Sequence, residues 1–224
     1  MNVSEAVARR ISVRAFKSDT VPVSLVRELL EKAARAPSGG NLQPWKVYVL
    51  AGEPLAELKR NGMAAAMART ETPVYNIYPP DLWEPLKTRR FQVGEDMYGI
   101  LGIPREDRAA RIAWFGNNIQ LFGAAVGLFF TLDRRCGPPQ WSDVGMMMQT
   151  LMLLAVEAGL ATCPQEFWAT LPETVRAATG YPDEEILFSG MALGWPDENA
   201  PINSLRTRRE PVDVFAEFRG FRRP

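Results

Sequence analysis

Short apolar runs of strand length alternate along this chain with longer helical patterns. Residues 126–132 are continuously apolar, and shorter strand patterns occur at residues 46–50, 160–165 and 185–193. Helical patterns fill the segments between them, at residues 22–34, 54–69, 89–101, 106–122 and 141–158, with a shorter one at residues 172–179. Strands separated by helices of ten or more residues favour an α/β sandwich built around one sheet.

Capping residues indicate where several of these helices begin and end. Ser4 is expected to cap a short N-terminal helix, and Ser24 is expected to cap the next one. Glu28 and Lys32 lie four residues apart on that second helix and form a supporting ion pair. Gly180 follows the last helical pattern, at the position where a left-handed residue commonly ends a helix.

The overall charge provides no field that would draw the chain to nucleic acid or to an anionic membrane. The 224 residues include 26 basic and 26 acidic side chains, and 46% are hydrophobic, which is enough for one buried core.

The most apolar stretch, residues 144–156, contains Gln149 and is too short to cross a bilayer. Cys136 and Cys163 lack metal-site spacing, and no signal-peptide pattern opens the sequence. We therefore expect one cytoplasmic domain over residues 1–224.

The chain contains no histidine. Histidine is the usual general base, a common zinc ligand and the centre of Ser-His-Asp and Cys-His catalytic arrangements. If the chain is an enzyme, a cofactor is expected to carry the chemistry. Neither a GxGxxG nor a GxxxxGK[ST] pattern occurs, so a Rossmann or P-loop nucleotide site has no support in the sequence.

A glycine-rich connection, APSGGNLQPWKVYVL at residues 36–50, joins a helical pattern to a strand pattern. Glycines let backbone N–H groups approach a ligand closely, and the neighbouring serine and asparagine add small polar side chains. We interpret the stretch as a ligand-cradling loop. An ordinary helix-to-strand connection is the alternative.

Arg10, Ser12 and Arg14 occur at alternate positions near the N-terminus, so they share one face of an extended segment. Guanidinium groups bind phosphate oxygens bidentately, and a hydroxyl adds a further donor. This face predicts a phosphate clamp. Three solvated side chains near a terminus are the alternative.

A proline-rich aromatic stretch interrupts the helical patterns at residues 70–85 and contains Tyr75, Tyr78 and Trp83. Such a stretch inside a domain is typical of a lid over a pocket or of a structural excursion. We expect residues 70–101 to form a lid-like excursion.

Amides and a basic tail supply further candidates. Asn117, Asn118 and Gln120 carry amides that could read the edge of a heterocycle, although exposed helix polars are the default explanation. Residues 196–224 are arginine-rich, yet they carry phenylalanines that need burial, on the chain's own body or on a partner subunit.

The chain resembles the flavin-dependent nitroreductase family in five motifs that occur in matching order: RRISVRAF at 9–16, APSGGNLQPWKV at 36–47, GLATCPQEFW at 159–168, GMALGWP at 190–196 and NSLRTRREP at 203–211. The resemblance implies an α+β fold with a central, mostly antiparallel sheet flanked by helices. It also implies an intertwined homodimer with one FMN in each of two interface sites, in which the C-terminal arm, residues 196–224, reaches the partner subunit.

The resemblance also assigns cofactor and substrate contacts residue by residue. The N-terminal motif and the tail of one subunit would hold the FMN phosphate and ribityl chain, the Gly-Gly loop would come from the other subunit, amides would contact the pyrimidine, and a backbone N–H would face flavin N5. The residues of the N-terminal motif and the tail are Arg10, Ile11, Ser12, Arg14, Arg206 and Arg209, and those of the Gly-Gly loop are Pro37, Ser38, Gly39 and Asn41. The amides at the pyrimidine are Asn117 and Gln120, and the residues at flavin N5 are Pro164, Gln165 and Glu166. The candidate walls of the substrate pocket are Tyr78, Trp83 and Trp168. The chain departs from the family at Ile11, where a second arginine or a histidine is common, and at Gln120, where some members have lysine.

The activity implied by the resemblance is NAD(P)H-dependent reduction of nitroaromatic compounds to hydroxylamines, with quinones as secondary acceptors. Tightly bound FMN would take a hydride from NADH or NADPH and pass it to an acceptor that stacks in the vacated place, so the kinetics should be ping-pong and no catalytic side chain or metal is needed. The alternatives are a reductive dehalogenase, a dehydrogenase or a flavin-fragmenting enzyme on the same scaffold, or a non-enzymatic flavin-binding protein.

Overall fold

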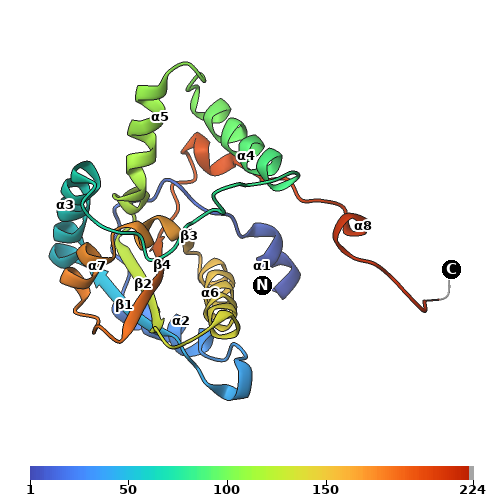
Figure 1. Cartoon of the computed structure of the whole chain (residues 1–224), viewed down its shortest axis with the longest axis horizontal. Helices are drawn as coiled ribbons and strands as arrows, with labels where there is room; N and C mark the ends of the chain where they lie inside the picture. Colours follow the sequence, from blue (N-terminus) through green and yellow to red (C-terminus); the bar gives the residue numbers. More distant parts are fainter. Residues whose placement is uncertain (222–224) are drawn as a thin grey trace.

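An antiparallel sheet forms the centre of the molecule (Figure 1). The computed structural model describes residues 1–221. Within that range the sheet has four strands in the order β1-β2-β4-β3, and every neighbouring pair is antiparallel. The strands are β1 (Lys46–Ala51), β2 (Val126–Asp133), β3 (Ala161–Gln165) and β4 (Glu185–Gly194). Each predicted strand is confirmed to within one residue at either end.

Helices cover both faces of the sheet, as predicted for a sandwich (Figure 1). They are α1 (Val3–Arg9), α2 (Val23–Ala33), α3 (Gly52–Ala68), α4 (Leu86–Leu101), α5 (Arg108–Phe115), α6 (Pro138–Glu157), α7 (Pro172–Thr179) and α8 (Val212–Phe215). Helices α2 and α6 pack on one face of the sheet, and α3 and α7 pack on the other. No helix in residues 1–221 is both long enough and apolar enough to span a membrane.

Strand β2 is apolar throughout because its side chains alternate between the two hydrophobic layers. Leu128 and Phe130 pack with α2 and α6, whereas Phe129 packs with α3 and α7. All three side chains are fully buried. The continuous apolar run is therefore that of a strand covered on both sides.

The observed helix ends correct two capping predictions. Helix α1 is capped by Asn2, not Ser4: the Asn2 side chain accepts from Glu5 N at 2.9 Å, and the Glu5 carboxylate accepts from Asn2 N at 3.0 Å. Helix α2 begins after Pro22, so Ser24 lies inside the helix and caps nothing. The Glu28–Lys32 ion pair, at 2.6 Å, is confirmed, as is the left-handed Gly180 at the end of α7.

The helix predicted over residues 106–122 is shorter than expected. Helix α5 ends at Phe115, and short 3₁₀ turns follow at Gly116–Asn118 and Leu121–Gly123. Leu121 and Phe122 have φ values of 49° and 54°, a left-handed conformation that side chains rarely adopt unless packing enforces it. Both side chains are buried, so the apolar pattern that suggested a continued helix reflects burial of an irregular segment.

Helices α4 and α5 and residues 206–221, which we call the arm, project from the sheet and its covering helices (Figure 1). Of the arm predicted over residues 196–224, residues 196–205 lie against the rest of the chain, where Ile202 and Leu205 are buried, and residues 222–224 lie outside the described residues. We call the remaining, compact part of the chain the body. The arm carries large apolar side chains in the open: Phe215 is 73% exposed and Phe221 is 77% exposed, with Val212, Val214 and Phe218 also exposed. Contiguous apolar surface of this kind marks an interaction site.

Candidate functional site

The segment that follows α1 lies along the outer edge of β3. Val13 N donates to Thr162 O at 3.0 Å, and Ser12 pairs with Thr162 in an isolated parallel bridge. The Asn203 side chain holds the next residues, because its Oδ1 accepts from Arg14 N and its Nδ2 donates to Ala15 O, both at 2.8 Å. Val13 is buried, whereas Ser12 and Arg14 are only partly buried. The extended, alternating segment that the sequence predicted is present.

Guanidinium groups gather beside this segment without acidic partners. Burial lowers the pKa of Arg10, and the charge of Arg209 lowers it further. The charges of Arg14 and Arg10 lower the pKa of the Cys163 thiol, but burial has the larger effect and raises this pKa to about 11. Within residues 1–221, Arg10, Arg14 and Arg209 form no ion pair with a carboxylate. An unpaired group of cations suits an anionic ligand.

Arg206 lies in the same tail segment as Arg209, and both donate to nearby oxygens of that segment. Arg206 Nη1 donates to Asn203 O at 3.1 Å, and Arg209 Nη1 donates to Thr207 Oγ1 at 2.6 Å. Ile11, between Arg10 and Ser12, is partly buried. The start of the tail lies beside the N-terminal segment within one chain, because Asn203 bonds to Arg14 N and Ala15 O.

A cavity of about 800 Å³ lies between the body and the projecting helices. The body contributes Arg14, Asn118, Cys163 and Pro164 to its lining. The opposite wall is one face of α4 together with aromatic side chains from α4, α5 and the segments beside them, namely Tyr78, Phe91, Tyr98, Trp114, Phe115 and Phe122. The charged side chains of Glu84, Lys87, Arg90 and Glu95 also belong to this second wall. A cavity with an aromatic lining and a few polar groups is typical of a small-molecule site.

Two buried side-chain oxygen atoms near β3 lack hydrogen-bond partners in the described residues. Gln165 Nε2 donates to Asn118 O at 2.8 Å and to Asn118 Oδ1 at 3.2 Å, but Gln165 Oε1 has no partner in the described residues. Thr162 Oγ1, beside Ser12, is also unsatisfied. Buried polar atoms are rarely left unpaired, so these atoms mark a place where a ligand or water completes the site.

Asn118 is the amide that lines the main cavity. Asn117 lines a smaller neighbouring cavity, which it shares with Arg14, and Gln120 lies on the α3 side, next to Lys59 and Met63. The structure therefore does not bring Gln120 together with Arg14. The 3₁₀ turns after α5 rotate successive side chains away from one another, and for that reason helical spacing did not single out Asn118.

The Gly-Gly loop lies elsewhere in the chain. Gly39 N donates to the buried Asp143 carboxylate at 3.3 Å, and Ser38 Oγ accepts from Gln43 N at 3.0 Å, so the loop is held against α6. Pro37, Ser38, Gly39 and Asn41 do not line the main cavity. A Cβ added at Gly39 or Gly40 would meet no atom of residues 1–221 within 4 Å, so the side of the loop away from Asp143 has open space beside its glycines.

Of the aromatic residues predicted to wall the substrate pocket, Tyr78 lines the cavity. Trp83 is 58% exposed and lies outside the lining. Trp168 is fully buried against Phe129, so it is a core residue and the prediction that it walls the pocket is wrong. The short helix Glu166–Thr170 turns the Trp168 ring toward the sheet, away from the cavity. Trp114 and Phe115, on the predicted helix at 106–122, line the cavity and were missed.

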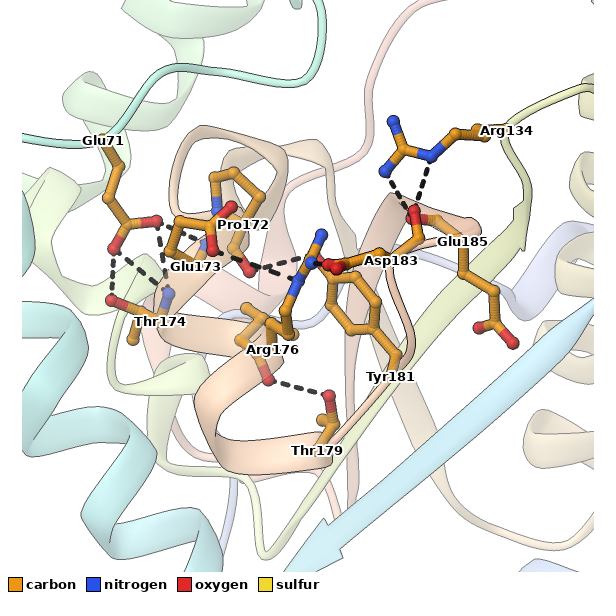
Figure 2. A network of polar contacts seen from close by, with 11 residues as sticks. Glu71, Arg134, Pro172, Glu173, Thr174, Arg176, Thr179, Tyr181, Asp183 and Glu185 are labelled. Carbon is orange, nitrogen blue, oxygen red and sulfur yellow. Dashed lines mark hydrogen bonds and ion pairs between the residues drawn. The ribbon is translucent and has the colours of Figure 1, made fainter.

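The start of the proline-rich stretch is attached to the body. Glu71 accepts from Glu173 N at 2.7 Å and from Thr174 N at 3.1 Å, which caps α7, as Figure 2 shows. Val74 N donates to Ala169 O at 2.9 Å, and Tyr75 OH donates to Phe188 O. These contacts tie residues 71–75 to the short helix Glu166–Thr170, to the first turn of α7 and to β4.

Glu166 begins the short helix after β3, close to this attached stretch. Its charge raises the pKa of Tyr75, although burial of Tyr75 is the larger cause. Burial raises the pKa of the Glu166 carboxyl as well. The end of β3 thus places Pro164 at the cavity, Gln165 against Asn118 and Glu166 beside Tyr75.

The chain is similar to known proteins over nearly its whole length. The chain is 39% identical over 217 residues to a 4-nitrobenzoate reductase of Pseudomonas putida, covering 97% of this chain and 95% of that protein. It is 33% identical over 218 residues to a nitrobenzene nitroreductase of Ectopseudomonas oleovorans, covering 96% of each. Among solved structures, the FMN- and NADPH-dependent nitroreductase NfnB from a Sphigopyxis strain matches with a TM-score of 0.96 at 48% identity, over 99% of this chain and 100% of that one.

A model of one protein family covers most of the chain. The nitroreductase family model matches residues 7–195, which include the N-terminal arginine segment, the Gly-Gly loop and all four strands of the sheet. The chain belongs to the nitroreductase family.

Proposed function

We propose that this protein is an FMN-dependent NAD(P)H oxidoreductase that reduces nitroaromatic compounds to hydroxylamines. The observation that carries the proposal is the gathering of unpaired guanidinium groups from Arg10, Arg14 and Arg209 beside a cavity with an aromatic wall. The names of relatives support it, since they include nitroreductases described as FMN- and NADPH-dependent.

Residues of the body, together with Arg209 of the arm, fit FMN. Arg10, Arg14 and Arg209 would hold its phosphate, and Ser12 would add a hydroxyl donor. The unsatisfied Gln165 Oε1 and the Asn118 amide offer an acceptor and a donor suited to the edge of a flavin ring. Bound FMN would supply hydride acceptance from NADH or NADPH and hydride delivery to the acceptor.

The chain's own side chains would bind and orient the reactants. Tyr78, Trp114 and Phe115 offer ring faces for an aromatic acceptor, and the apolar wall excludes water from the reacting atoms. Cys163 stays a thiol at neutral pH because burial raises its pKa to about 11, so it offers no competing nucleophile. Quinones are expected as secondary acceptors. Because donor and acceptor would use the same place, we expect ping-pong kinetics.

A homodimer would complete the site. The Gly-Gly loop lies outside the cavity of its own chain, and its glycines have open space beside them. The arm carries exposed phenylalanines that a partner would cover. Pro37, Ser38, Gly39 and Asn41 would then reach the cofactor of the partner subunit, and residues 78–101 would form the lid over it. Cys136 and Cys163 are both free thiols, which suits a cytoplasmic location.

The absorbance spectrum of the purified protein tests the proposal. The protein should be yellow, its flavin band should bleach on anaerobic addition of NADPH, and the band should return on addition of nitrobenzene. A colourless protein that takes up no added FMN would overturn the assignment of the cofactor. A flavin that NADPH bleaches but that no nitroaromatic reoxidises would favour a dehydrogenase or a dehalogenase, and a flavin that neither NADH nor NADPH reduces would favour a flavin-binding protein.

A further inference from the structure

The α4 wall of the cavity carries two cations that nothing in the proposed cofactor site uses. Lys87 and Arg90 lie three residues apart, on the face of α4 that lines the cavity. The next residue on this face, Phe91, and the nearby Tyr78 present aromatic rings to the same space. Cationic and aromatic groups are therefore adjacent on one wall.

The other charged residues of α4, Arg89, Glu95 and Asp96, are paired, whereas Lys87 and Arg90, which are both exposed, are not. Arg89 binds Glu210 at 2.9 Å, Arg208 lies 3.7 Å from Asp96, and Arg111 binds Glu95 at 2.7 Å. Within residues 1–221, neither Lys87 nor Arg90 forms an ion pair.

Arg90 is held in place by an aromatic ring. Its guanidinium carbon lies 4.1 Å from the centre of the Tyr78 ring, and both residues line the cavity. Stacking of this kind orients the guanidinium plane and leaves its N–H groups free to donate. A carboxylate can accept two such N–H groups in parallel, while Lys87 adds a point charge.

The acidic residues on the lining do not cancel these charges. Glu95 is neutralised by Arg111. The Glu84 carboxylate accepts from Thr88 N at 3.2 Å at the start of α4 and forms no ion pair with a described residue. Arg14 is assigned to the cofactor and is not counted here. On the α4 wall, beside the aromatic rings, the two cations that are unpaired within residues 1–221, Lys87 and Arg90, outnumber the one unpaired carboxylate, Glu84.

We propose that Lys87 and Arg90 form a carboxylate-binding subsite that selects aromatic acids as the acceptors of this enzyme. The ring of the acceptor lies among the aromatic side chains of the cavity, and its carboxylate binds at the α4 wall. This inference rests on the proposed function for the use of the cavity, and it narrows the substrate class from nitroaromatics in general to those bearing a carboxylate.

Binding of non-reducible ligands to the oxidised holoenzyme tests the subsite without turnover. Benzoate should bind about tenfold or more tightly than benzamide, measured by titration calorimetry or by the shift of the flavin band, because each charge-assisted contact adds a severalfold gain. The double variant Lys87→Gln/Arg90→Gln should abolish this preference. Arg108→Gln, which removes an exposed cation of α5 outside the lining, should leave the preference unchanged.

Turnover and rescue complete the test. The double variant should raise KM for 4-nitrobenzoate about tenfold, with little change for 4-nitrobenzamide or NADPH, and Lys87→Arg should retain the wild-type preference. Equal weakening of both benzoate and benzamide, no change in either, or a raised KM for NADPH alone would overturn the subsite. A benzoate preference that the double variant abolishes in a protein that reduces no nitro compound would leave the subsite standing and refute the proposed function.

Discussion

The two walls of the cavity differ in how firmly the chain holds them. On the body wall, the backbone of Val13 and Arg14 is hydrogen bonded to Thr162 and Asn203, and Cys163 is 3% exposed. On the opposite wall, α4 buries none of its residues. Partly exposed ion pairs, such as Arg89–Glu210, connect it to the arm, and such pairs contribute at most about 1 kcal/mol each.

The difference separates the wall that one chain builds by itself from the wall for which we propose a partner. The body wall has its geometry from the sheet, so the proposed cofactor contacts there should persist in an isolated subunit. The α4 wall and the arm expose apolar side chains that only another surface can cover. Changes in the arm should therefore affect assembly, whereas changes in the body should affect folding or the binding of the cofactor.

The largest effect is expected from the arm variant Phe215→Ser/Phe218→Ser. Each phenylalanine contributes about 1.5–3 kcal/mol when it is buried, so losing both should weaken dimerisation by about 10²–10⁴-fold. Sedimentation equilibrium measures the dissociation constant. Val23→Ser, which alters an exposed valine of the body, is the matched control. A double variant as dimeric as the wild type would show that the arm is not part of the interface.

Arg14→Ala tests the body wall directly. The loss of a charge-assisted hydrogen bond, about 1.5–3 kcal/mol, should weaken FMN binding about tenfold to a hundredfold, as measured by fluorescence titration of the apoprotein. Riboflavin, which lacks the phosphate, should be affected much less. Arg27→Ala, in α2, serves as the control. Equal losses for FMN and riboflavin would show that Arg14 does not bind the phosphate.

Gly190→Ala tests how tightly the body is packed behind that wall. A Cβ at Gly190 would lie 2.3 Å from Cδ1 of the buried Trp168, so the ring has to move. Overpacking of this kind costs about 1–3 kcal/mol in the free energy of unfolding, which urea denaturation measures. At Gly145, in α6, an added Cβ meets nothing within 4 Å, and Gly145→Ala should be neutral or slightly stabilising. Similar losses in both variants would argue against the Trp168 contact as the cause.

The smallest effect is expected where the proline-rich stretch joins the body. Glu71→Gln weakens the cap of α7 and should lower the free energy of unfolding by about 0.5–2 kcal/mol, with faster hydrogen exchange at residues 71–75. Glu57→Gln, an exposed glutamate of α3, should change neither quantity. Unchanged exchange in Glu71→Gln would mean that Val74 and Tyr75 suffice to hold the stretch.

The side-chain directions of residues in extended segments were predictable, because they alternate along the backbone. Arg10, Ser12 and Arg14 alternate in an extended segment, as expected, and the motif at residues 159–168 lies on β3. The prediction for Trp168 was wrong, and Trp114 and Phe115 were missed. These side chains lie on short 3₁₀ turns or at a helix end, where periodicity does not set the direction of a side chain.

The sequence by itself determined the order of strands and helices along the chain, because hydrophobic periodicity records which faces of an element are buried. It also indicated a strand from the apolar run at residues 126–132, whereas the interior position of β2, covered on both faces, came from the tertiary structure. Only the tertiary structure decided that Asn118 rather than Gln120 lines the cavity with Arg14, and that Glu71 caps α7. The first result depends on the turns after α5, whose left-handed conformations at Leu121 and Phe122 are enforced by the packing of the core. The second depends on a contact between residues far apart in the sequence.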